Sequence, residues 1–174
     1  MSNWYMLTLV GKDRPGIVSR ITLALYESGG NLGEASMVRL GGNFSIMLMV
    51  QYDGSAESLE NGISQVCNNL ELQIHLDRIE GRLHDHLEPD VRISIYGADR
   101  VGIVAETTGA LTEAGLNILN LESDVAGTAD KPIYIMEIEG VAGKGIESIK
   151  STLDRLAKEK SVETRFTPID TLMG

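Results

Sequence analysis

The sequence predicts an α+β protein made of two copies of one βαββαβ module, each a four-stranded antiparallel sheet with two helices on one face. Two observations support this fold class. The chain resembles itself when it is shifted by 86 residues, and a repeat of this kind indicates a duplicated structural unit. Within each copy, short apolar runs alternate with helical patterns in the order strand, helix, strand, strand, helix, strand.

The repeat is strongest at the start of each copy. The segment Gly11–Val18 (GKDRPGIV) aligns with Gly97–Val104 (GADRVGIV), and more than half of residues 11–31 are identical to the residue 86 positions later. Beyond this region the register slips by about three residues, which places Ile46 and Met47 over Ile135 and Met136. The second copy also has a longer connection at residues 126–132.

In the first copy, residues 4–10 form an apolar run that predicts a strand. A helix follows, because Ile17, Ile21, Ala24 and Leu25 recur at helical spacing. The Gly29-Gly30-Asn31 segment ends this helix. Strands are predicted at 32–40 and 43–52, joined by the hairpin signal Gly41-Gly42-Asn43. A helix at 55–69 and a strand at 72–80 complete the module.

The second copy has the same order of elements. Strands are predicted at 91–96, 118–126, 132–140 and 162–168, and helices after Gly102 and at 143–158. This order predicts a ferredoxin-like arrangement in each module. Residues 82–90 are polar and contain Pro89, so we expect a first module at 1–81, a linker at 82–90 and a second module at 91–174.

The bulk composition narrows the classes of function. A net charge of −10 opposes direct binding to nucleic acid, which requires clustered Lys and Arg. The single cysteine, Cys67, rules out an internal disulfide and indicates a reducing compartment. We expect it on the inner face of a helix, packed in the core. The apolar runs, such as residues 46–50, are too short to span a membrane, and no signal peptide is visible. We therefore expect a cytoplasmic location.

The repeated loop connects a strand to a helix, so its N–H groups lie at a helix N-terminus, which favours an anion. Asp13 and Asp99 are suited to capping that helix, and Pro15 to its first turn. Gly16 and Gly102 would allow the backbone to approach a neighbouring strand or a carboxylate closely. A capped helix start of this composition is also ordinary structure, and Arg14 and Arg100 could simply pair with carboxylates.

The strand, DRPGIV loop, helix and GGN arrangement resembles the ACT domain, a regulatory module of amino-acid metabolism. Two such modules in tandem resemble in particular the glycine cleavage system transcriptional repressor family. The resemblance implies that an amino acid binds between the strand–helix loop of one module and the second-strand region of its neighbour. It implies these ligand-binding residues: Asp13, Arg14, Pro15, Gly16, Ile17, Val18 and Asn31 in the first copy, and Asp99, Arg100, Gly102, Ile103, Val104 and Asn117 in the second.

Alternatives remain at some of these positions. Asn31 and Asn117 would also serve in a helix-ending turn, which Asn tolerates. The second copy has Val101 in place of Pro15, and its longer hairpin contains Asp130 and Lys131. We therefore expect two sites that are related but not equivalent.

The expected function is that of a regulator rather than an enzyme. It would bind a small amino acid such as glycine and act through a protein partner such as a transcription factor. A detached regulatory subunit of an amino-acid metabolic enzyme is the alternative, and a small catalyst on the same scaffold is a third possibility. We expect no cofactor and no metal, since His84, Asp85 and His86 are too close together to enclose an ion. Sheet edges of ACT modules often pair, so a homodimer is one expected assembly.

Overall fold

The structure is a computed structural model that describes residues 3–80, 87–98, 101–128 and 130–169. The chain divides into two compact units, residues 1–85 and 86–174, which are considered separately below. Part of the predicted linker lies outside the described residues. At its far end, the Asp90 carboxylate accepts a hydrogen bond from the Ala142 N–H at 2.9 Å, and the Asp90 carbonyl accepts one from the Ile169 N–H at 2.8 Å. Asp90 is thus held by the second unit, and the module boundaries remain a prediction.

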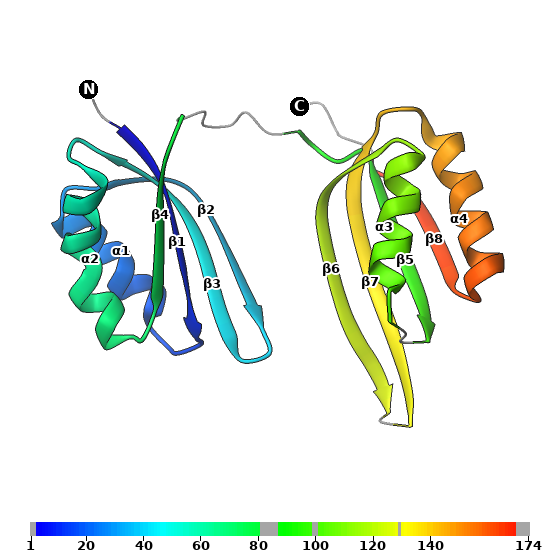
Figure 1. The fold of residues 1–174 in the computed structure, drawn as a ribbon, viewed down its shortest axis with the longest axis horizontal. Helices are drawn as coiled ribbons and strands as arrows, with labels where there is room; N and C mark the ends of the chain where they lie inside the picture. Colours follow the sequence, from blue (N-terminus) through cyan, green and yellow to red (C-terminus); the bar gives the residue numbers. More distant parts are fainter. Residues whose placement is uncertain (1–2, 81–86, 99–100, 129, 170–174) are drawn as a thin grey trace. The chain divides into compact units, whose positions relative to one another are not determined.

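The first module has the predicted order of elements. Its sheet has the strand order β2-β3-β1-β4, with antiparallel neighbours throughout. Both helices cover one face of this sheet (Figure 1). The elements are β1 (Asn3–Lys12), α1 (Ile17–Glu27), β2 (Asn31–Leu40), β3 (Asn43–Tyr52), α2 (Ala56–Asn69) and β4 (Gln73–Ile79).

The second module repeats this topology with the strand order β6-β7-β5-β8. Its elements are β5 (Val91–Ala98), α3 (Ile103–Glu113), β6 (Leu116–Thr128), β7 (Lys131–Ala142), α4 (Ile146–Lys160) and β8 (Glu163–Pro168). The α+β fold class and the ferredoxin-like βαββαβ arrangement of both copies are therefore confirmed.

Each module has its own apolar core between the helices and the sheet. Helix α1 buries the four residues that its periodicity predicts, Ile17, Ile21, Ala24 and Leu25. Cys67 of α2 belongs to the same core and is fully buried, as expected. Burial raises the pKa of its thiol to about 11, because a thiolate is poorly solvated in an apolar interior.

The β2–β3 hairpin has the two-residue connection that its sequence predicts. Leu40 pairs with Asn43 across the turn, and Gly41 and Gly42 have φ values of 55° and 77°. Two consecutive residues with positive φ are typical of a type I′ turn, whose twist matches that of the strands on either side. The hairpin therefore folds back tightly, and its tip lies at the same end of the module as the β1–α1 loop (Figure 1).

The predicted alignment of the two copies needs one correction. Leu9 pairs with Ile46, and Ile95, which is 86 residues after Leu9, pairs with Met136. Ile46 therefore corresponds to Met136, so the register slips by four residues rather than about three. The extra residues lengthen the β6–β7 hairpin, where Gly127 pairs with Pro132 and Thr128 with Lys131. An even slip is required because an odd one would turn every side chain of the strand to the opposite face.

The sheet faces that the helices leave uncovered differ in chemistry between the modules. In the first module, Met47 lies on this face opposite Thr8, and Met49 lies opposite Met6. In the second module, Glu137 and Glu139 occupy the corresponding places on β7. The Glu139 carboxylate pairs there with Arg92 at 2.6 Å. The fold thus tolerates either apolar or charged side chains on this face.

We predict that Leu25→Ala lowers the free energy of unfolding of the first module by about 2–5 kcal/mol, because it leaves a cavity in the core. Leu23→Ala is the matched control on the same helix: Leu25 is fully buried, whereas Leu23 is 55% exposed. Leu23→Ala should change the free energy of unfolding by no more than about 0.5 kcal/mol. Trp4, the single tryptophan of the chain, lies on β1, so urea unfolding followed by its fluorescence measures this module. Equal losses for the two variants would contradict the assigned core.

Candidate functional site

The repeated loop makes the same tight turn in both modules. Gly16 has φ 83° and ψ 6°, and Gly102 has φ 87° and ψ −4°. These are the angles of the third residue of a type II turn, a position that strongly favours glycine. A Cβ on either glycine would meet no close neighbour, since the nearest heavy atom at Gly16 is the Ser19 Oγ at 3.8 Å. Backbone conformation, rather than close approach of another strand, therefore explains why this glycine recurs.

The predicted capping role of Asp13 is wrong. The N-cap of α1 is Gly16, with no side-chain capping hydrogen bond. The Asp13 carboxylate instead forms an ion pair with Arg39 of β2, and the Asp13 N–H donates to the Gly42 carbonyl at 3.0 Å. The turn at Pro15 and Gly16 separates Asp13 from the helix, so Pro15 also precedes the helix rather than lying in its first turn. Asp99, the counterpart of Asp13, lies outside the described residues.

Helix α1 begins with N–H groups that have no acceptor within the helix. The Arg20 N–H donates to the Gly16 carbonyl at 3.2 Å, so the N–H groups of residues 17–19 precede the first intrahelical bond. The first turn of α1 contains no acidic residue, and its own side chains therefore do not neutralise the positive end of the helix dipole. This end of the helix favours an anion.

A surface cavity of about 510 Å³ lies at this helix end. All six loop residues predicted for the first copy, 13–18, line it. Four further residues complete its wall, and three of them come from the adjacent ends of β2 and β3: Ser19, Met37, Arg39 and Phe44. The structure thus brings the first predicted loop together around one cavity.

Two arginines contribute to the cavity wall, and each is paired with a carboxylate. Arg14 contacts Glu71 at 2.7 Å, which is the kind of surface pair expected for it. Arg39 pairs with Asp13, and its side chain is 67% exposed. The cavity therefore presents a positive helix end beside an ion pair that a ligand can reach from solvent.

The sequence prediction missed Met37, Arg39 and Phe44. Met37 pairs with the core residue Ile46, and Arg39 pairs with Phe44, so all three side chains belong to the helix-covered face of the sheet. The Gly41-Gly42 turn could have revealed them. It places the end of β2 and the start of β3 beside the end of β1, and period-2 alternation then assigns their faces.

The two predicted asparagines lie apart from the loops of their own modules. Asn31 is the first residue of β2 and pairs with Gln51 of β3. Asn117 lies in β6 and pairs with Val141 of β7. Both are exposed. Asn31 lies beyond the C-terminal end of α1, a helix of 11 residues and so about 16 Å long. The loop and the asparagine therefore do not form one site within a module.

The second module differs from the first at the corresponding positions. Asp99 and Arg100 lie outside the described residues, whereas Gly102, Ile103 and Val104 begin α3 as their counterparts begin α1. In the first module, Phe44 pairs with Gly11 on one side and with Arg39 on the other. In the second module, Tyr134 pairs in the same way with Gly97 and with Val125. Val125 therefore replaces Arg39, and by the same register Ser123 replaces Met37.

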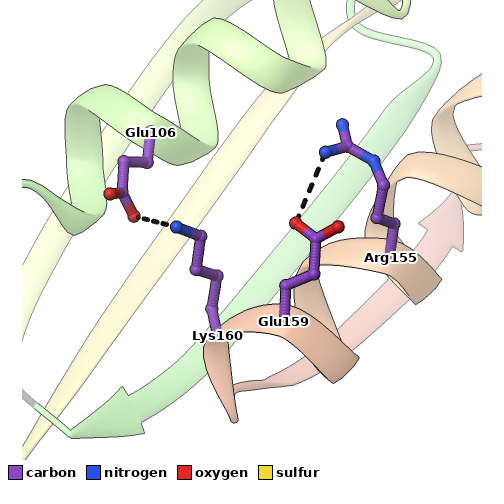
Figure 2. Close-up of polar contacts among 4 residues, drawn as sticks. All are labelled: Glu106, Arg155, Glu159 and Lys160. Carbon is purple, nitrogen blue, oxygen red and sulfur yellow. Dashed lines mark hydrogen bonds and ion pairs between the residues drawn. The ribbon is translucent and has the colours of Figure 1, made fainter.

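A second cavity, of about 330 Å³, lies between α3 and α4. Its charged groups largely pair with one another: Lys160 contacts Glu106 at 3.0 Å, and Arg155 contacts Glu159 at 3.5 Å (Figure 2). Exposed pairs of this kind contribute little free energy. This cavity also lacks the repeated loop, so the cavity of the first module is the stronger candidate site.

Two further features can be assessed over the described residues. No group of three or more His, Cys, Asp or Glu side chains there could hold a metal ion. Residues 84–86, for which the sequence predicts no metal site, lie outside the described residues. Among the described helices, none is long and apolar enough to cross a membrane.

Comparison with known proteins supports the predicted resemblance. Residues 5–77 and residues 91–160 each match the ACT domain family. The chain is 25% identical over 122 residues to the glycine cleavage system transcriptional repressor of Escherichia coli K12, and equally to that of Shigella flexneri. The match covers 70% of this chain but only 64% of each of those proteins.

Solved structures share the fold over nearly the whole chain. A protein of unknown function from Galdieria sulphuraria superposes with a TM-score of 0.75 at 22% identity, covering 97% of this chain and 99% of that one. A structure named as a candidate glycine cleavage system transcriptional repressor gives a TM-score of 0.68 at 17% identity, with 97% and 98% coverage. At these identities the likeness shows the fold alone.

We predict opposite effects for two Gly→Ala changes in the same module. Gly102→Ala should destabilise the protein by about 1–2 kcal/mol, because φ is positive there. Gly109→Ala, within α3, should stabilise it by up to about 1 kcal/mol, because the helix favours alanine and the added Cβ meets open space. Urea unfolding followed by circular dichroism checks both. A neutral Gly102→Ala would contradict the assigned turn.

Proposed function

The chain belongs to the ACT domain family, with two ACT domains in tandem, and from this premise we propose that it is an amino-acid-sensing regulator. The effector binds in the cavity of the first module, at the loop Asp13–Val18. The second module has diverged at the corresponding wall, so the two loops are not equivalent as sites. The proposed role is regulatory rather than catalytic.

One observation carries this proposal: a single cavity contains a free helix N-terminus and the Asp13–Arg39 ion pair. A free amino acid has an ammonium and a carboxylate two bonds apart. Its carboxylate can accept from the N–H groups of α1 or from Arg39, and its ammonium can donate to Asp13. The cavity thus offers complementary charges for both ends of a zwitterion.

A link to regulation follows from the same ion pair. Asp13 belongs to the β1–α1 loop and Arg39 to the edge strand β2, so a ligand that engages either residue changes a contact between these two elements. A ligand shifts a conformational equilibrium only by its difference in affinity for the two states. In the proposed mechanism, the ligand favours one arrangement of the loop and the β2–β3 hairpin, and a partner protein recognises that arrangement.

The curated relatives named above are transcriptional repressors, and this supports a transcription factor as the partner. The charge of −10 supports action through a protein rather than through direct contact with DNA. The proposal therefore places this chain upstream of a DNA-binding protein.

We predict that isothermal titration calorimetry with the twenty amino acids finds at least one that binds the full chain. Arg39→Val, which copies the residue of the second module, should weaken that binding about 10-fold or more, since hydrogen bonds to charged groups contribute about 1.5–3 kcal/mol. Arg78→Val removes the same charge from β4, where Arg78 donates to Asn3 at 2.8 Å, outside the cavity. It should bind like the wild-type protein. Absence of binding by every amino acid at millimolar concentration would refute the sensor.

We further predict that affinity purification recovers a transcription regulator and that the bound effector changes the amount recovered. The unmutated chain is compared with and without the amino acid found by calorimetry, with Arg39→Val as the control that should not respond. A biosynthetic enzyme as the effector-dependent partner would instead identify the chain as a detached regulatory subunit.

A further inference from the structure

We propose that the cavity of the first module selects an amino acid with an extended apolar side chain over glycine. This inference rests on the proposed function and names the class of effector for the same site. It arises from the uncharged part of the cavity wall. The two charged groups of a zwitterion would not contact this part, so their binding does not explain why it is there.

Part of the cavity wall is apolar and accessible. Met37 is 49% exposed and Val18 is 40% exposed, although both line the cavity. Phe44, which also contributes to the wall, is buried in the core and is fixed there. Contact between this surface and an apolar ligand group should raise the affinity for the ligand about fourfold for each methylene removed from water.

Glycine cannot use this surface because it has no side chain. The cavity volume of about 510 Å³ lies within the range of about 300–1,000 Å³ for sites that bind small organic ligands. A bound glycine would engage the charged groups and leave Met37 and Val18 in water. A straight or γ-branched side chain extending from the same α-carbon would cover them.

The nature of the wall indicates a class of ligands rather than one amino acid. Met37 has an unbranched and flexible thioether side chain, which can adapt to apolar groups of different shapes. Leucine, methionine and their straight-chain analogues should therefore bind with similar affinity. The charged groups of the cavity orient the ammonium and carboxylate of the ligand, while the apolar wall favours a longer apolar side chain.

The second module shows that this wall is not needed for the fold. Ser123 occupies the place of Met37, and Val125 occupies the place of Arg39. The duplicated sheet thus forms with both residues changed. The combination of an arginine with an exposed methionine on one face is specific to the first module, and we assign the selectivity to it.

The test uses a homologous series of ligands: glycine, alanine, 2-aminobutyrate, norvaline and norleucine. Affinities are measured by calorimetry on the full chain and on Met37→Ser, which copies the second module. In the wild-type protein, affinity should rise about two- to fourfold for each added methylene. In Met37→Ser, this slope should flatten.

Met47→Ser provides the matched control. Met47 is 47% exposed, close to the value for Met37, but it lies on the opposite face of the same sheet, where it pairs with Thr8. The variant should keep the full slope of the wild-type protein. Trp4 fluorescence verifies that the first module of each variant is folded.

The outcomes separate this inference from the proposed function. Binding that rises along the series and depends on Met37 supports both. A flat series, a preference for glycine, or an unchanged slope in Met37→Ser overturns the inference and leaves the amino-acid sensor standing. Failure of every member of the series and of all twenty amino acids to bind overturns both.

Discussion

The left-handed glycine between the first strand and the first helix of each module is the constraint on which the candidate site depends. Gly16 allows the chain to leave β1, turn, and begin α1 with Ile17 already in the core. The same turn sets Asp13 apart from the helix end and leaves the first N–H groups of α1 without a side-chain cap. Because the tip of the β2–β3 hairpin lies at this end of the sheet, the uncapped helix end, Asp13 and Arg39 meet around one cavity.

The architecture could be predicted from the sequence because it depends on patterns repeated many times along the chain. The helical spacing of Ile17, Ile21 and Leu25 gives the buried face of α1, and Gly41-Gly42 gives the hairpin. The helical pattern recurs 86 residues later, where α3 buries Ile103, Thr107 and Leu111. A local error therefore left the fold class unchanged, as the register slip shows: assigned as about three, it is four by strand pairing.

The site could be predicted only in part, because its partners come from distant positions. Residues 13–18 were found since they form one short repeated motif. Arg39 is 26 positions beyond Asp13, and neither residue carries a local signal for their ion pair. The capping prediction failed for a related reason. An aspartate three residues before a glycine fits a helix cap in sequence, but the turn at Pro15 and Gly16 moves the helix start beyond its reach.

The duplication separates what the fold requires from what the first module adds. Both copies keep the left-handed glycine, the buried isoleucine that follows it and the order of strands, because these hold the sheet and helices together. They differ where the fold imposes no demand: Met37 becomes Ser123, Arg39 becomes Val125, and Met47 on the uncovered face becomes Glu137. In such a pair, the second module serves as an internal reference that has the same order of strands and lacks the Met37 and Arg39 side chains of the first cavity. A property that is retained when those side chains are replaced by their counterparts depends on the fold. A property that is lost with them depends on ligand binding.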